Sequence, residues 1–160
     1  MRIEGSDGAN WIEVTLAGYE FPDEIIERET MNWLETDLRV RTFHGRGVSR
    51  VALMRTWDAA DFAHWLESLS AAYVGSESIM VFPEPNLQMK AVRWPAYVAI
   101  DIYFILEQPG QWDMNDAFYP TSSHHYVGNM TIDIALPALH AAAASLRSDL
   151  LRFPVREPNT

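Results

Sequence analysis

The sequence contains no cysteine, which removes several classes of chemistry at once. There can be no disulfide, no thiolate nucleophile and no cysteine-bound zinc, and nothing indicates an oxidising compartment. Long apolar runs are also missing, because Asp101 interrupts the longest of them, at residues 98–106, well short of the roughly 20 residues of a membrane-spanning helix. No apolar signal-peptide segment follows Met1. We therefore expect a soluble, cytoplasmic protein.

Charge is distributed unevenly along the chain. The 160 residues carry a formal net charge of −10, and residues 1–37 hold ten Asp and Glu against Arg2 and Arg28, a net charge of −8. Such a charge repels the phosphates of nucleic acids and favours a basic protein partner. We expect no binding to nucleic acid or membrane.

Alternating apolar residues predict a series of strands. Residues 34–42 place Leu34, Leu38 and Val40 on one face, and His44 to Gly47 then provide a turn into a strand at residues 48–54. The clearest alternation covers residues 97–107. Further strands are predicted at residues 10–17, 78–82, 87–92 and 130–136.

Two segments have the spacing of amphipathic helices. The first begins at Thr56 or Asp58 and ends near Gly75, and the second begins at Pro137 and ends before Pro154. Their predicted buried positions are Phe62, Trp65, Leu66, Leu69 and Tyr73 in the first helix, and Leu139, Ala142, Ala143, Leu146, Leu150 and Phe153 in the second. Residues 108–128 have neither period and are predicted to be a long connection.

Strands in hairpins together with two main helices indicate the α+β class. We predict one domain over residues 1–160, with a mostly antiparallel sheet of about six to seven strands.

No catalytic or metal site stands out. His124 and His125 near Asp113 and Asp116, and His64 with Glu67, lack the ligand spacing of a metal centre. Asp101 and Asp133 could form a carboxylate pair for acid–base chemistry if their strands were neighbours. More commonly, such carboxylates face solvent or pair with arginines. Five arginines, which could bind phosphate, are better explained as partners of Glu35, Asp37 and neighbouring acids: Arg39, Arg41, Arg46, Arg50 and Arg55.

Five short motifs, in order, resemble the WapI-type immunity proteins of bacteria. They are Tyr19-Glu20-Phe21-Pro22, Asn32-Trp33-Leu34, Thr56-Trp57-Asp58, Glu84-Pro85-Asn86-Leu87 and Arg152-Phe153-Pro154. The resemblance implies a non-enzymatic protein without cofactors. It also implies that the protein binds and neutralises the C-terminal toxin domain of a polymorphic toxin, often a nuclease.

An acidic surface for fast association and aromatic anchors for slow dissociation would suit a basic toxin. The candidate partner-binding residues are Asp23, Glu24, Glu27, Glu29, Trp112, Phe118 and Tyr119. Two alternatives remain open: a small hydrolase that uses Asp101 and Asp133 or the His124 segment, and a structural subunit or homo-oligomer joined through a sheet edge.

Overall fold

Two antiparallel sheets form most of the protein. The computed structural model describes residues 1–158 except 24–26, 44, 85–86, 108–118 and 123–124. The first sheet has the order β1-β2-β3-β4, and the second has the order β5-β6-β7-β9-β8. The strands are β1 (Arg2–Glu4), β2 (Trp11–Tyr19), β3 (Trp33–Thr42), β4 (Gly45–Arg55), β5 (Glu77–Val81), β6 (Leu87–Arg93), β7 (Tyr97–Glu107), β8 (Tyr119–Ser122) and β9 (His125–Ala135).

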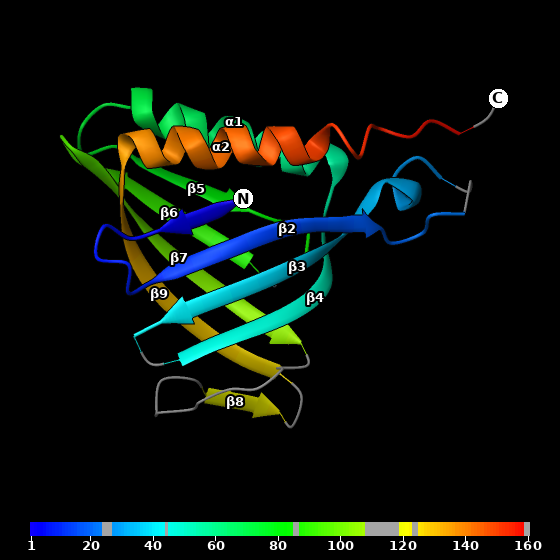
Figure 1. Cartoon of the computed structure of the whole chain (residues 1–160), viewed down its shortest axis with the longest axis horizontal. Coiled ribbons are helices and arrows are strands. Elements are labelled where there is room, and N and C mark those ends of the chain that lie inside the picture. The colour runs from blue at the N-terminus through cyan, green and yellow to red at the C-terminus, as the bar shows by residue number, and fades with distance from the viewer. Residues whose placement is uncertain (24–26, 44, 85–86, 108–118, 123–124, 159–160) are drawn as a thin grey trace.

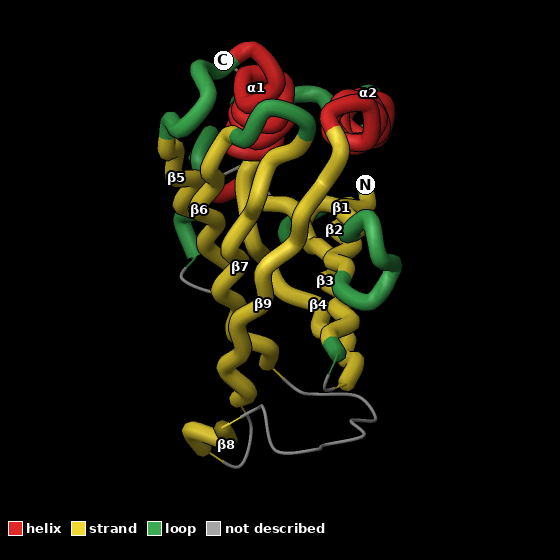
Figure 2. The backbone as a smooth tube through the Cα atoms, turned by 90° about the vertical axis from the view of Figure 1, so that its left-hand side faces the viewer, coloured by secondary structure: helices red, strands yellow, loops and turns green. Residues whose placement is uncertain are grey.

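Two helices lie side by side across one end of the two sheets (Figure 1). They are α1 (Thr56–Ala71) and α2 (Leu136–Leu150), and a short 3-10 helix, η1 (Thr30–Asn32), precedes β3. In the rotated view the sheets face each other below the helices (Figure 2). One cluster of buried side chains draws on both sheets and both helices. The arrangement is therefore a two-layer sandwich closed at one end by a helix pair.

Period-two alternation accounts for the inner faces of the sheets. In β2 the side chains of Ile12, Val14 and Leu16 are buried, and the alternate residues are not. In β7 the side chains of Val98 and Phe104 mark the ends of another buried row. Burial of these rows against the facing sheet supplies the hydrophobic stabilisation of the sandwich.

The predicted α+β class, with mostly antiparallel strands and two main helices, is confirmed. The predicted strand number was too low, because the described residues form nine strands in two sheets rather than six to seven in one. Alternation identifies which face of a strand is buried but not which strand lies beside it, so it could not separate the sheets.

Three predicted boundaries were wrong. The strand predicted to begin at residue 48 begins at Gly45, the partner of Thr42, so residues 45–47 of the predicted turn belong to β4. Helix α1 ends at Ala71, so the side chain of Tyr73 is 90% exposed, and Gly75 instead adopts a φ of 84° before β5. The predicted connection at residues 108–128 contains β8 and the start of β9.

No helix within the described ranges is long and apolar enough to cross a membrane.

Replacing Phe62 with Ala should destabilise the protein by about 3–5 kcal/mol, the usual cost of removing a buried aromatic ring. Phe62 is fully buried and packs edge to face on Phe82, with ring centroids 4.9 Å apart. Urea denaturation would measure the free energy of unfolding. The matched control, Tyr73→Ala, removes an aromatic ring that is 90% exposed, so a change of less than about 0.5 kcal/mol is expected. Equal effects of the two substitutions would contradict the packing described for α1.

Candidate protein-binding surface

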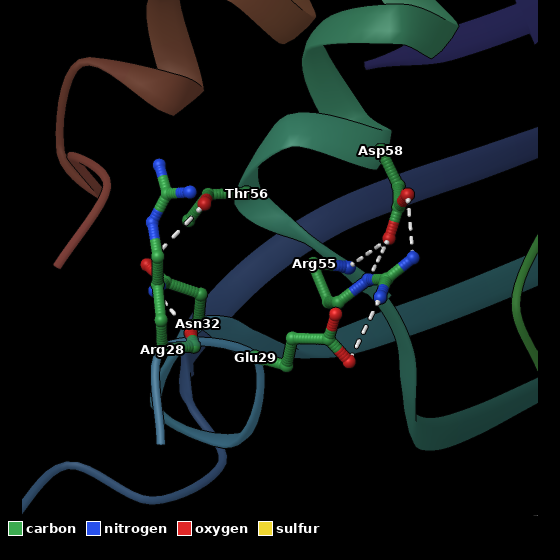
Figure 3. Close-up of polar contacts among 6 residues, drawn as sticks. All are labelled: Arg28, Glu29, Asn32, Arg55, Thr56 and Asp58. Carbon is green, nitrogen blue, oxygen red and sulfur yellow. Dashed lines mark hydrogen bonds and ion pairs between the residues drawn. The ribbon is translucent and has the colours of Figure 1, made fainter. Parts of the chain in front are cut away.

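A buried asparagine holds together the end of the molecule that carries the acidic segment, residues 20–29. The Asn32 side chain donates hydrogen bonds to the carbonyl oxygens of Arg28 and Arg156, at 2.6 Å and 2.9 Å. Its amide oxygen accepts the backbone N–H of Arg156 at 2.7 Å and the hydroxyl of Thr56 at 3.4 Å. Figure 3 shows Asn32 between Arg28 and Thr56. The segment before β3, the start of α1 and the C-terminal tail therefore meet at one side chain.

Arg156 anchors the same segment from its other side. Its guanidinium group donates to the carbonyl oxygens of Phe21 at 2.8 Å and Pro22 at 2.9 Å. The guanidinium carbon also lies 4.9 Å from the ring centroid of Tyr19, whose hydroxyl donates to the carbonyl of Pro154. Burial raises the pKa of Tyr19, and the charge of Arg156 partly offsets this rise. The acidic segment is thus fixed to the tail at residues 21, 22 and 28.

A second arginine joins the start of α1 to the acidic segment. The Arg55 guanidinium donates to the carboxylate of Asp58 at 2.7 Å and lies 3.7 Å from the carboxylate of Glu29 (Figure 3). It also lies over the rings of Trp57, at 5.0 Å, and Trp33, at 5.7 Å. The hydrogen bond that Arg55 donates to Asp58 is the main cause of the raised pKa of Arg55. Arg55 is thereby held in place while Glu29 keeps a side chain that is 76% exposed.

The predicted acidic residues that can be placed are exposed. Asp23, Glu27 and Glu29 are exposed, whereas Glu24 lies outside the described residues. Neither Asp23 nor Glu27 forms an ion pair with another described residue. Their charges are therefore free to act on a partner.

The predicted aromatic anchors are not brought to this surface. Trp112 and Phe118 lie outside the described residues, and of Tyr119 only the strand position in β8 is described. β8 is the edge strand of the second sheet, whereas the acidic segment connects β2 and β3 of the first, and the two lie apart (Figure 1). Contact between these aromatic residues and a partner stays a prediction.

Sequence reasoning missed a pocket beside the acidic segment. The pocket has a volume of about 380 Å³, and its lining comes from the β2–η1 segment, η1, β3, β4 and the β5–β6 connection. Burial raises the pKa of Glu20, and the carboxylates of Glu35 and Glu84 raise it further. The lining residues are Glu20, Phe21, Thr30, Trp33, Val51, Ala52 and Glu84. No local pattern could have found this pocket, because the residues come from separate segments of the chain.

Arg39, Arg50 and Arg55 of the first sheet pair with acids, as predicted, whereas no ion pair among the described residues involves Arg41 or Arg46, which lie opposite each other in the register of β3 and β4. Arg50 donates to both carboxylate oxygens of Asp37, its cross-strand partner, at 2.7 Å and 3.0 Å. The Arg50 hydrogen bond lowers the pKa of Asp37. Arg39 lies 3.5 Å from Glu13, also a cross-strand partner. These pairs satisfy charges that could otherwise have indicated a phosphate site.

The carboxylates of the alternative hydrolase lie on neighbouring strands. Asp101 of β7 pairs in register with Thr131 of β9, two residues from Asp133, so the two acids are diagonal neighbours. The Thr131 hydroxyl donates to Asp101 at 2.7 Å, and Lys90 occupies the register position on the other side. His64 lies 4.0 Å from Glu67, which is bound more closely by Arg147 at 2.7 Å. Within the described residues no group of three or more His, Asp or Glu could hold a metal ion.

A family model described as the immunity protein WapI-like family matches residues 2–154. The chain belongs to this family. The resemblance carried by the five motifs is thereby confirmed. Membership of the WapI-like family indicates a toxin-neutralising immunity function and suggests a non-enzymatic role. Comparisons with curated proteins and with solved structures gave no significant match.

Replacing Asn32 with Ala should lower the free energy of unfolding by about 3 kcal/mol, because the change leaves several buried polar groups without partners. Urea denaturation would measure the loss. The control, Asn129→Ala, removes the same side chain from an exposed position and should cost less than about 0.5 kcal/mol. A loss below 1 kcal/mol at Asn32 would contradict its role in joining the three segments.

Replacing Glu20 with Gln should stabilise the protein at neutral pH. The pKa of Glu20 is raised in the folded state, so ionisation of this carboxyl opposes folding increasingly as the pH rises from the ordinary carboxyl pKa through the folded pKa, and fully above it. Below the ordinary carboxyl pKa, Glu20 is protonated in both states, and the opposition disappears. Because the side chain is exposed and solvent screens its charge, the gain at pH 7 should be at most about 0.5 kcal/mol.

Urea denaturation at pH 7 and at about pH 3 would test this effect. The stabilisation by Glu20→Gln should be present at pH 7 and absent at the lower pH. If the variant is less stable than the wild type at pH 7, the negative charge of Glu20 makes a net favourable interaction in the folded state, and the expectation is wrong.

Proposed function

We propose that this protein neutralises its cognate toxin by binding the toxin's C-terminal domain through the acidic end of the sandwich. The observation that carries the proposal is the exposure of Asp23, Glu27 and Glu29 on a segment that Asn32 and Arg156 fix from both sides. Residues that such contacts hold in place lose less conformational entropy when they bind. Membership of the WapI-like family supplies the class of partner.

The excess negative charge favours a basic toxin, such as a nuclease. A nuclease carries positive charge where it contacts phosphates, so an acidic inhibitor is attracted to the same place that the substrate occupies. Binding there excludes the substrate from the active site. Inhibition in this form is occlusion and requires no catalytic residue in the inhibitor.

The charge pattern of the described residues supports one orientation of approach. The acids Glu13 and Asp37 of the first sheet are paired with arginines, and Glu67 on α1 is paired with Arg147. Asp23 and Glu27 have no such partner among the described residues. The charges of Asp23 and Glu27 therefore stay available for long-range attraction, which would favour approach of a basic toxin to this end.

Co-expression with the toxin domain encoded immediately upstream would test the proposal. We expect the protein to rescue growth and to copurify with that domain. Replacement of Asp23, Glu27 and Glu29 by Lys should slow association by about tenfold or more at low salt, since steering raises association rates by this order. Association rates from surface-bound toxin at several salt concentrations would measure the effect.

The control carries the same change of charge elsewhere. Asp61 on α1 and Asp101 and Asp133 on the second sheet are exposed, and their replacement by Lys should alter the association rate much less. Equal slowing by both triple variants would mean that only net charge matters. Unchanged association of the Asp23, Glu27 and Glu29 variant would remove the acidic segment from the interface.

A further inference from the structure

The pocket beside the acidic segment has the lining of a receptor for one long cationic side chain. Trp33 and Phe21 contribute aromatic surface, and Val51 and Ala52 contribute aliphatic surface. Glu20 and Glu84 add two carboxylates from opposite parts of the chain. A volume of about 380 Å³ has room for one extended side chain and several waters, given that a water occupies about 30 Å³.

The carboxylates at this pocket form no ion pair within the described part of the chain. The same holds for the nearby Glu35. Glu20 is instead surrounded by like charge, which comes from Glu35 and Glu84. A positive group placed between them would convert this repulsion into attraction.

The same end of the protein already binds guanidinium groups on aromatic faces. Arg55 lies over Trp33, a residue of the pocket wall, and both Arg55 and Arg28 lie over Trp57. Arg156 lies over Tyr19, next to Glu20 in the chain. These internal contacts do not involve Glu20, Glu35 or Glu84, and they indicate guanidinium as the chemistry that the aromatic surface accommodates.

We infer that the pocket formed by Glu20, Phe21, Trp33 and Glu84 receives an arginine side chain of the toxin. The methylene groups of the arginine pack on Val51 and Ala52, and the planar guanidinium lies against the aromatic wall while it donates to the carboxylates. Lysine fits less well, because its compact ammonium group neither stacks nor donates two parallel hydrogen bonds. The inference rests on the proposed function for the identity of the partner, and on the pocket alone for the chemistry.

The frame around the pocket is suited to this role. The backbone N–H of Glu20 donates to the carbonyl of Trp33 at 2.9 Å, and Arg156 holds the carbonyls of Phe21 and Pro22. The wall residues are therefore positioned before a partner arrives, so that an entering arginine is the main group that must be ordered.

A short peptide tests the chemistry without the toxin. The probe is acetyl-Gly-Arg-Gly-amide, and its control carries citrulline, which has the shape of arginine without the charge. The indole N–H resonance of Trp33, assigned with Trp33→Phe, would report binding in a nitrogen-15 spectrum. We expect a saturable shift with a dissociation constant on the order of 1 mM for the arginine peptide and none for the citrulline peptide.

The double variant Glu20→Gln, Glu84→Gln should lose this shift while the rest of its spectrum stays that of the folded protein. Its matched control, Glu4→Gln, Glu77→Gln, removes the same charge from sites outside the pocket and should keep the shift. No arginine-dependent shift in the wild-type protein, or equal shifts with citrulline, would overturn the inference.

Binding of the toxin domain then separates this inference from the proposed function. We expect the pocket variant to bind the domain at least tenfold more weakly, and the control variant to bind as the wild type does. If the wild type fails to bind, the proposed function is wrong, and the peptide titration still decides the chemistry of the pocket. If the pocket variant binds the toxin as tightly as the wild type does, the toxin does not place an arginine there.

Discussion

The buried amide of Asn32 is the interaction on which the acidic end of the protein depends. An asparagine side chain has two N–H donors and an oxygen with two lone pairs, and here all four are used. The partners are Arg28, just before η1, Thr56 at the start of α1, and Arg156 in the C-terminal tail. Because an unsatisfied buried amide is costly, these three segments are coupled: displacement of any one leaves a polar group of Asn32 without a partner. The place of the acidic segment relative to the sheets follows from this coupling.

The motifs that carried the family resemblance are neighbours in space. Tyr19 to Pro22 contact the tail through Tyr19 and Arg156, Asn32 bonds to Thr56 and to the tail, and Phe153 packs edge to face on Tyr19 with ring centroids 5.7 Å apart. Glu84 joins Glu20, Phe21 and Trp33 at the pocket. As separate words in a sequence the motifs have no evident chemistry. In the folded protein the described residues of these motifs contact one another, and together they form the end of the molecule that carries carboxylates and aromatic rings.

How far sequence reasoning reached depended on whether a feature was local. Strand β7 was predicted at both of its ends, since its alternation is set by neighbours two residues apart. The end of α1 was misplaced, because Tyr73 continues the helical spacing although the backbone turns away after Ala71. The acidic segment was visible as composition, but its fixation was not, because Asn32 and Arg156 lie 124 residues apart. The pocket likewise joins Glu20 to Val51 and Glu84.

The cations at the acidic end explain why it remains acidic. Arg156 donates to backbone carbonyls, Arg55 to Asp58, and Arg28 lies 3.1 Å from Glu157. Each of these arginines thus contacts a neighbouring segment, and among the described acids of the acidic segment Arg55 lies near Glu29. In the first sheet, by contrast, Arg39 and Arg50 are paired across the strands with Glu13 and Asp37. Arginine and acidic residues therefore have different roles in the two places. On the sheet, paired charges neutralise each other. At the acidic end, the arginines position the backbone, and the exposed carboxylates keep their negative charge. A basic partner at this end would replace the repulsion that Glu35 and Glu84 exert on Glu20 with attraction.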